Sequence, residues 1–258
     1  MVNQAWREFE TEIARWRDAG RPVEFWWRDD DAERPARALA RLLDLAADTG
    51  VPLALAVVPG GAVPELFDAL HAGVAVLQHG VDHRNRAAAG EKKTEFSEAE
   101  PADAAIARLA AGRVRLGSLA GTRSIAVLAP PWNRLPAALV PRLNAAGLRG
   151  FSAYGARAAA APAPGVTQVN THVDVIAWRS GRGFVGEDQA LGLAVRHLAA
   201  RRSGLAEPAE PTGWLTHHAC HDEAVWSFLS RLFETTLRAP EILWRRAADL
   251  FGDGGPRS

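Results

Sequence analysis

Three consecutive aspartates end an aromatic run near the start of the chain, in the stretch FWWRDDDAE (25–33). Adjacent carboxylates repel one another, and each loses hydration if the strand end lies in a cleft. A bound cation would relieve both costs, and a free carboxylate beside it could act as a general base. Asp29, Asp30 and Asp31 therefore predict a site that combines metal binding with proton transfer.

Two histidines four residues apart, His79 and His83 in HGVDH, offer further ligands. In a turn of helix this spacing places both imidazoles on one face. With one carboxylate from the aspartate cluster they make a set of two nitrogens and one oxygen, which catalytic zinc uses with water in its open position. We therefore expect a divalent cation as cofactor, and these ligands favour zinc. The histidine pair alone would be weak evidence.

Other chemical groups follow apolar runs later in the chain. His217 follows Trp-Leu-Thr, and it could be a fourth ligand, a core histidine or a general acid. His218 and His221 lie beside it and leave the assignment of the acid open. Asp174 could orient that histidine by accepting its other N–H, or it could cap the following turn. Arg28 could hold an aspartate base in its ionised form.

A rigid aromatic wall is predicted where two prolines precede a tryptophan. The run Pro130-Pro131-Trp132 forces extended backbone and removes two hydrogen-bond donors. We expect Pro131, Trp132 and Trp178 to line a sugar-sized pocket.

Strand and helix patterns alternate along the chain and must position these groups. Apolar runs predict seven strands, at 23–27, 52–58, 74–78, 124–129, 151–154, 166–176 and 213–218. Helical spacing predicts helices at 1–20, 35–49, 64–71, 102–116, 136–146, 187–201, 226–237 and 242–251. The alternation implies parallel pairing and right-handed crossovers, hence a barrel or an open doubly wound sheet. In either fold, functional groups gather at the carboxyl edge of the sheet, where five of the seven predicted strands end in polar or aromatic motifs.

Length and composition limit the classes of protein. The 258 residues carry a formal net charge of zero, so no global field would gather nucleic acid or an anionic membrane. One cysteine excludes an intrachain disulfide, and no segment approaches the roughly 18 apolar residues of a membrane span. We expect a single catalytic domain over 1–258, located in the cytoplasm, with no nucleic-acid partner.

Taken in chain order, these motifs resemble those of the polysaccharide deacetylase family. These carbohydrate esterases remove N- or O-acetyl groups with a divalent metal on a distorted (β/α)7 barrel. The family motif Thr-Phe-Asp-Asp is similar to residues 28–31, which implies Asp30 as general base and Asp31 as metal ligand. A shift of one would make the pair Asp29 and Asp30.

The remaining family motifs match to different degrees. His79 and His83 match the metal-binding histidines, and Leu215-Thr216-His217 matches Leu-x-His, which implies His217 as the general acid. Ala129 stands where Arg-x-Pro-aromatic has its arginine, so Arg28 could supply that guanidinium from the first strand. The motif Asp-x-x-Asp-Trp survives only as Asp174 and Trp178, with altered spacing.

The resemblance implies metal-assisted removal of an acetyl group from a carbohydrate or a sugar-containing substrate. Asp30 would take a proton from water, a backbone N–H near Trp132 would help hold the oxyanion, and His217 would protonate the leaving group. The expected location favours a small, lipid-linked or nucleotide-linked acetylated sugar. One alternative is hydrolysis of another C–N amide bond, in a cyclic ureide or formyl amide; another is a catalytically silent carbohydrate-binding protein. The loop 90–96, which holds both lysines, is either a lid or a solvated loop.

Overall fold

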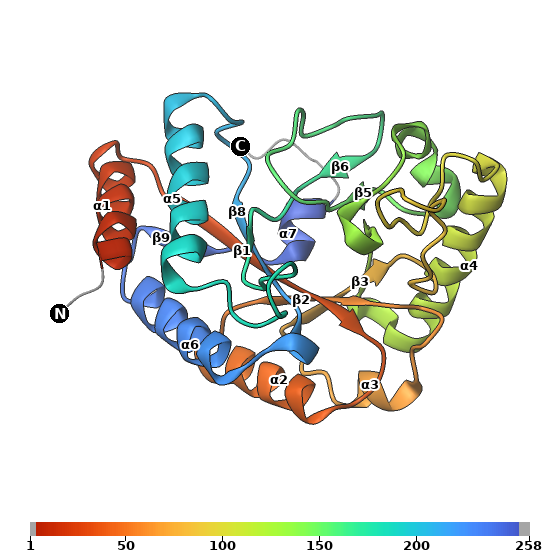
Figure 1. Cartoon of the computed structure of the whole chain (residues 1–258), viewed down its shortest axis with the longest axis horizontal. Helices are drawn as coiled ribbons and strands as arrows, with labels where there is room; N and C mark the ends of the chain where they lie inside the picture. The colour runs from red at the N-terminus through yellow and green to blue at the C-terminus, as the bar shows by residue number, and fades with distance from the viewer. Residues whose placement is uncertain (1–3, 253–258) are drawn as a thin grey trace.

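The apolar runs of the sequence form a curled sheet in which every ladder between named strands is parallel (Figure 1). The computed structural model describes residues 4–252. The strands are β1 (Val23–Ala32), β2 (Leu53–Val57), β3 (Val74–His79), β4 (Ser124–Ala129), β5 (Gly150–Phe151), β6 (Thr167–Gln168), β7 (Val173–Asp174), β8 (Thr212–Thr216) and β9 (Ile242–Trp244). Their order is β6-β5-β4-β3-β2-β1-β8-β7, with β9 paired to β1.

One extended segment bridges the two ends of this sheet. The sequence predicts a single strand over 166–176, and the structure divides it into β6 and β7. β6 pairs with β5, and β7 pairs with β8. The first part of the segment therefore lies against β5 and the last part against β8. This segment counts as the seventh strand of a distorted (β/α)7 barrel, whose other six strands are β1 to β5 and β8.

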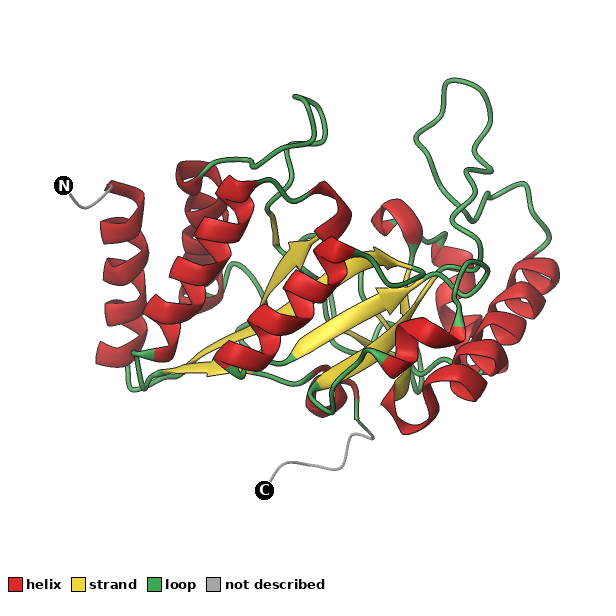
Figure 2. Ribbon diagram, turned by 90° about the horizontal axis from the view of Figure 1, so that it is seen from below, coloured by secondary structure: helices red, strands yellow, loops and turns green. Residues whose placement is uncertain are grey.

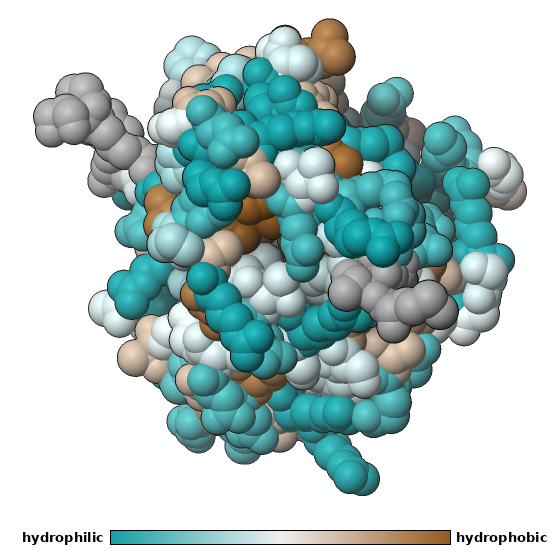
Figure 3. All heavy atoms as spheres, turned by 90° about the vertical axis from the view of Figure 1, so that its left-hand side faces the viewer, coloured by the Kyte–Doolittle hydropathy of each residue, from teal (hydrophilic) through white to brown (hydrophobic). Residues whose placement is uncertain are grey.

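Helices cover the outside of the sheet (Figures 1 and 2). They are α1 (Gln4–Asp18), α2 (Arg37–Thr49), α3 (Pro64–Asp68), α4 (Ala102–Ala120), α5 (Glu187–Ser203), α6 (Glu223–Leu237) and α7 (Ala247–Phe251), with 3-10 segments η1 (Gly121–Arg123), η2 (Pro131–Asn133), η3 (Ala137–Ala146) and η4 (His218–Cys220). Of the helices within 4–252, none has the length and apolar character that a membrane crossing needs. On the face that bears α1, the surface is mostly hydrophilic with small separate apolar spots (Figure 3).

Two helix predictions need correction. The predicted helix 242–251 is β9 followed by α7, because Ile242–Trp244 pairs with the first residues of β1. The predicted helix 136–146 is a 3-10 segment that contains Pro141, which cannot donate an intrahelical hydrogen bond. The predicted first helix begins within residues 1–3, which lie outside the described part of the chain.

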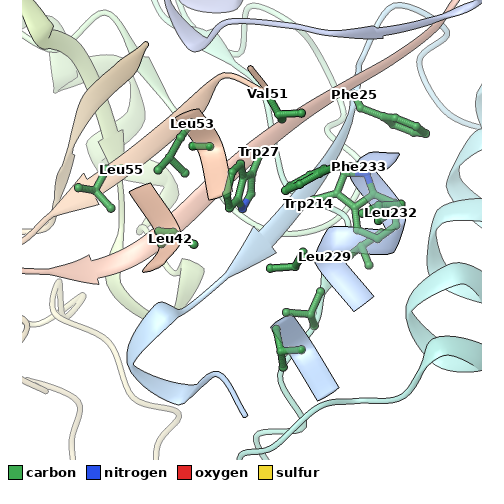
Figure 4. Close-up of a cluster of buried hydrophobic side chains, with 14 of the residues drawn as sticks. Phe25, Trp27, Leu42, Val51, Leu53, Leu55, Trp214, Leu229, Leu232 and Phe233 are labelled. Carbon is green, nitrogen blue, oxygen red and sulfur yellow. The ribbon is translucent and has the colours of Figure 1, made fainter. Parts of the chain in front are cut away.

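Side chains along β1 alternate between the two faces of the sheet. Phe25 and Trp27 belong to the main apolar cluster outside the barrel: Phe25 stacks on Phe9 of α1, and Trp27 meets Phe233 of α6 with ring centroids 4.8 Å apart (Figure 4). Trp26 belongs to a different apolar cluster, which it shares with Phe251 of α7. Arg28, two residues further, has the same orientation as Trp26 and is fully buried. The strand is thus anchored firmly on both faces before it reaches the aspartates.

Candidate active site

A β-bulge at the end of β1 directs two aspartates into one cavity. Asp29 pairs with Leu55 of β2 while Ala32 pairs with Val57, so three steps on β1 oppose two on β2. Asp31 has φ of 73°, a conformation rare outside glycine. Strict alternation would send Asp30 and Asp31 to opposite faces, but both line the same cavity. Bulges commonly re-aim a side chain beside a functional site.

Asp31, His79 and His83 converge on one point. Asp31 Oδ1 lies 3.0 Å from His79 Nε2 and 3.3 Å from His83 Nε2. His79 Nδ1 lies 2.9 Å from the carbonyl oxygen of Ala129, to which it must donate, so in the neutral imidazole its Nε2 presents a lone pair. A lone pair and a carboxylate oxygen at this separation require a proton or a cation between them. The three side chains fit a divalent metal, with His79 oriented as metal-binding histidines usually are.

The charges of this cluster support one another. Burial alone would lower the pKa of His79, but the nearby carboxylates of Asp30 and Asp31 outweigh it and raise that pKa. Burial alone would raise the pKa of Asp31, whereas hydrogen bonding to His79 and His83 holds it far below its ordinary value. Asp31 is therefore ionised and can serve as an anionic ligand.

The two histidines lie at either end of a loop, not on the helical turn that their spacing suggests. Residues 80–83 are irregular, with φ of 57° at Gly80 and 54° at His83. Glu95 fixes this loop: its Oε1 accepts from the backbone N–H of Val81 at 2.9 Å and of Asp82 at 3.1 Å. A side chain at Gly80 would collide with Glu95 and with Pro131.

Arg28 forms a two-point contact with Asp30 inside the barrel. Its Nε lies 2.9 Å from Asp30 Oδ1, and its Nη2 lies 3.0 Å from Oδ2. The other donors reach Ser152, at its carbonyl oxygen (2.8 Å) and Oγ (2.6 Å), and Asn133 Oδ1 (2.6 Å). Such a fork leaves the guanidinium and the carboxylate little freedom, so Asp30 is held at the cavity wall.

Asp29 belongs to a separate, outward-facing network. Its Oδ2 accepts from Thr216 Oγ1 at 2.7 Å and from the backbone N–H of His218 at 2.9 Å. Its Oδ1 lies 2.5 Å from His218 Nδ1. Burial alone would raise the pKa of Asp29, but the facing His218 outweighs it and lowers that pKa. Of the three aspartates, Asp31 contacts the histidine pair and Asp30 lines the same cavity, whereas Asp29 does neither.

Of the three clustered histidines, only His217 lines the cavity. Its Nε2 lies 4.0 Å from Asp30 Oδ2, and the Trp178 ring packs edge-on against it at a centroid distance of 4.6 Å. His218 is paired with Asp29, and His221 packs on Trp226 with its pKa lowered to about 4 by burial.

Asp174 caps the turn after β7 and makes no hydrogen bond to His217. Its Oδ1 accepts from the backbone N–H of Ile176 at 3.0 Å, and its Oδ2 accepts from Trp178 Nε1 at 2.7 Å. The buried Nδ1 of His217 has no hydrogen-bond partner within the described chain. The contacts that connect Asp174 to His217 run through Trp178, because Asp174 fixes the indole that packs against that imidazole.

A cavity of about 960 Å³ encloses these groups. Its walls include Trp132, Tyr154 and Trp178, whereas Pro131 is buried next to Gly80 and does not line the cavity. Five non-glycine residues between 4 and 252 have positive φ, and every one lines this cavity: Asp31, His83, Trp132, Asn133 and Arg182. Strained backbone concentrates at functional sites.

A second cluster, His172, His197 and Glu210, lies near the amino-terminal end of β8. His172 Nδ1 accepts the backbone N–H of Gly213 at 3.0 Å, so its Nε2 must carry the proton. That Nε2 lies 3.4 Å from Glu210 Oε2 and has no lone pair for a metal. The hydrogen bond of the other ring nitrogen, which favours His79 as a metal ligand, therefore excludes His172 as a ligand in this tautomer.

Several residues of the site escape prediction from sequence. Glu95 lies in a polar loop without period, and Ser152 follows a two-residue strand. Asn133 offers a weak signal, because asparagine tolerates the left-handed backbone needed after Trp132.

No protein-family model matches the sequence, and no curated protein matches it. Solved structures do share its fold. A proposed polysaccharide deacetylase from Mycobacterium smegmatis is 16% identical, with a TM-score of 0.60 over 90% of this chain and 89% of that one. A Streptococcus mutans CE4 esterase is 14% identical (TM-score 0.57; 89% and 87% covered), and the chitin deacetylase of Colletotrichum lindemuthianum is 15% identical (0.55; 91% and 89%). The chain thus has the distorted (β/α)7 barrel of the polysaccharide deacetylases, which confirms the predicted fold class.

Proposed function

We propose that this protein is a metal-dependent hydrolase that removes an N- or O-linked acetyl group from a carbohydrate or a sugar-containing substrate. One observation carries the proposal: Asp31, His79 and His83 converge beside an Arg28-bound Asp30 in a single cavity. Two structures of the same fold add support. One is described as a deacetylase with substrate (TM-score 0.52), and one is a family 4 carbohydrate esterase from Streptomyces lividans in complex with acetate (TM-score 0.51).

Asp31, His79 and His83 would hold the divalent ion, and their two nitrogens and one oxygen favour zinc. When bound, such an ion polarises an acyl carbonyl and lowers the pKa of water to about 7.

Asp30 is the proposed general base, which accepts a proton from the attacking water at Oδ2. Arg28 keeps that carboxylate in place, and the buried contacts of Arg28 to Ser152 and Asn133 keep the guanidinium from moving away. Proton transfer of this kind contributes on the order of 10²- to 10⁴-fold in rate.

His217 is the proposed general acid, which gives its proton to the departing amine or alcohol. Its Nε2 lies 4.0 Å from Asp30 Oδ2 on the wall of the cavity, and the Trp178 ring packs edge-on against its imidazole. Asp174 is a positioning residue that fixes Trp178. The backbone N–H of Trp132 is the candidate donor to the oxyanion, and the indoles of Trp132 and Trp178 would flank the sugar ring.

We propose that the chain acts as one catalytic domain. The cytoplasmic location stays a prediction from the sequence.

Acetate release tests the proposal. Zinc-loaded protein is assayed against acetylated amino sugars and their oligomers, acetylated xylose oligomers, and cyclic and formyl amides. We expect acetate from an acetylated sugar, with kcat lowered at least about 100-fold in Asp30→Asn. Asp44→Asn, an exposed position on α2, is the matched control and should keep full activity. Turnover of a cyclic or formyl amide alone would favour the rival hydrolase, and specific sugar binding without any turnover would favour a silent binding protein.

A further inference from the structure

Four basic side chains line the same cavity as the proposed catalytic groups: Lys93, Arg134, Arg179 and Arg182. They come from separate segments, namely the loop after β3 (olive in Figure 1), the turn after β4 and the loop after β7. All four residues are exposed. The cavity is therefore bordered by positive charge from several directions.

These cations lack carboxylate partners in the described chain. Within 4–252, no carboxylate oxygen lies within 4.0 Å of the charged nitrogens of Lys93, Arg134, Arg179 or Arg182. Elsewhere many arginines are paired, as Arg157 is with Glu207. Arg134 donates to the carbonyl oxygen of Lys93, a contact that joins two of the segments without neutralising either charge.

The carboxylates deeper in the cavity do not compensate for this charge. Of the three carboxylates that line the cavity, Asp30 is paired with Arg28 and Asp31 faces two histidines. Asp174 accepts hydrogen bonds from Ile176 and Trp178, and none of the three lies within 4.0 Å of the four cations. A neutral sugar would leave the four cavity-lining cations without a counter-charge, although the chain as a whole has a formal net charge of zero. Fields of one sign at a cleft attract ligands of the opposite sign, and arginine in particular matches phosphate and carboxylate geometry.

The cavity also exceeds the needs of one acetylated sugar. Its volume of about 960 Å³ lies near the upper end of the range for small-molecule sites, which is roughly 300–1,000 Å³. Tyr154 and Trp178 leave 43% and 42% of their surfaces exposed, so aromatic faces remain available for a sugar while the basic residues face another part of the ligand.

We propose that the substrate is an anionic acetylated sugar, and that these four cations bind its phosphoryl or carboxylate group. This inference rests on the proposed function, because it assigns the substrate class of that same cavity. It differs from that function in predicting a preference for charged over neutral acetylated sugars.

Binding calorimetry tests the preference independently of turnover. The protein is zinc-loaded full chain carrying Asp30→Asn, which prevents hydrolysis, and the probes are N-acetylglucosamine, its 1-phosphate and N-acetylmuramic acid. We expect a charged probe to bind at least about tenfold more tightly than the neutral sugar, with the advantage shrinking as salt is raised. Preference for the 1-phosphate would identify a phosphoryl ligand, and preference for N-acetylmuramic acid would identify a carboxylate.

Paired variants separate a specific site from bulk charge. Adding Arg179→Gln and Arg182→Gln should remove most of the advantage of the charged probe while affinity for the neutral sugar stays within about twofold. Arg7→Gln with Arg238→Gln removes the same charge from exposed positions outside the cavity and should change neither affinity. Equal affinity for charged and neutral probes, or equal losses in the two double variants, would overturn the inference.

Failure of this inference is distinguishable from failure of the proposed function. Efficient release of acetate from neutral sugars with no gain from a charged group would overturn the anionic substrate and leave the deacetylase. Tight, arginine-dependent binding of the charged probe without acetate release from any substrate would uphold the anion site and overturn the deacetylase.

Discussion

At the scale of single residues, three adjacent aspartates have three different partners. Asp29 faces Thr216 and His218, Asp30 faces Arg28, and Asp31 faces the histidine pair. From sequence, repulsion among the carboxylates predicted that they either face a positive group or stay in water. The sequence could not assign each partner, because the assignment depends on a bulge that adds one residue to β1 and leaves no compositional mark.

Single Asp→Asn substitutions should distinguish the roles of Asp30 and Asp31. We expect Asp31→Asn to lose bound metal, because it removes the only anionic ligand of the cluster, and to lose activity with it. Asp30→Asn should keep its metal and lose about 10²- to 10⁴-fold in kcat, because only the base is removed. Elemental analysis after dialysis, together with initial rates, measures both effects. Loss of metal in Asp30→Asn with retention in Asp31→Asn would reverse the two roles.

Asp29→Asn supplies the matched control for the metal assay. It should bind metal normally but lower the free energy of unfolding by about 3 kcal/mol, because His218 loses its buried carboxylate partner. Chemical denaturation measures the change. Loss of metal from Asp29→Asn at wild-type stability would show that this residue reaches the ligand cluster after all.

At the scale of elements, strand ends were predictable and loop geometry was not. Each strand from β1 to β4 overlaps its predicted range, because continuous apolar runs identify buried parallel strands. The spacing of His79 and His83 correctly grouped them, yet the segment between them is an irregular loop. Its shape depends on Glu95, whose contact partners are 13 and 14 residues away in the chain and are invisible to any local pattern.

Glu95→Ala should weaken metal binding without touching a ligand. The substitution frees the N–H groups of Val81 and Asp82, so His83 loses its fixed position; we expect metal affinity to fall on the order of tenfold. Competition with a fluorescent chelator measures the affinity, with circular dichroism to confirm the fold. Glu98→Ala, an exposed position in the same loop, should leave affinity unchanged. Equal metal affinities in the two variants would show that Glu95 does not hold His83 in its metal-binding position.

At the scale of the whole molecule, the two histidine clusters lie at opposite ends of β8. Thr212, which begins β8, contacts His197, and Thr216, which ends β8, contacts Asp29, two residues before the proposed ligand Asp31; the four steps between Thr212 and Thr216 span about 13 Å. Alternation predicted a barrel or an open doubly wound sheet, and the family resemblance implied the distorted barrel. The site was predicted from the rule that groups gather at carboxyl strand ends. It missed the division of the sixth strand and the strand β9, because both depend on distant pairing partners.

The buried cluster at the amino-terminal end should make stability fall in mild acid. Burial, with His172 and Arg201 nearby, lowers the pKa of His197 to about 2 from 6.5, so the unfolded chain takes up a proton that the folded chain cannot. The contribution of His197 is complete above pH 6.5 and is lost as pH falls, by about 2 kcal/mol at pH 5. Urea denaturation at pH 7 and pH 5 should show a smaller loss in His197→Gln than in wild type. Identical losses would mean that His197 does not resist protonation in the fold.

Acetate release as metal is returned to chelated protein tests the central claim most directly. We expect no release from metal-free protein, a rise with added zinc that ends at one equivalent, and no rise in His79→Ala that remains folded. Full activity without metal, or an unchanged zinc response in His79→Ala, would contradict it.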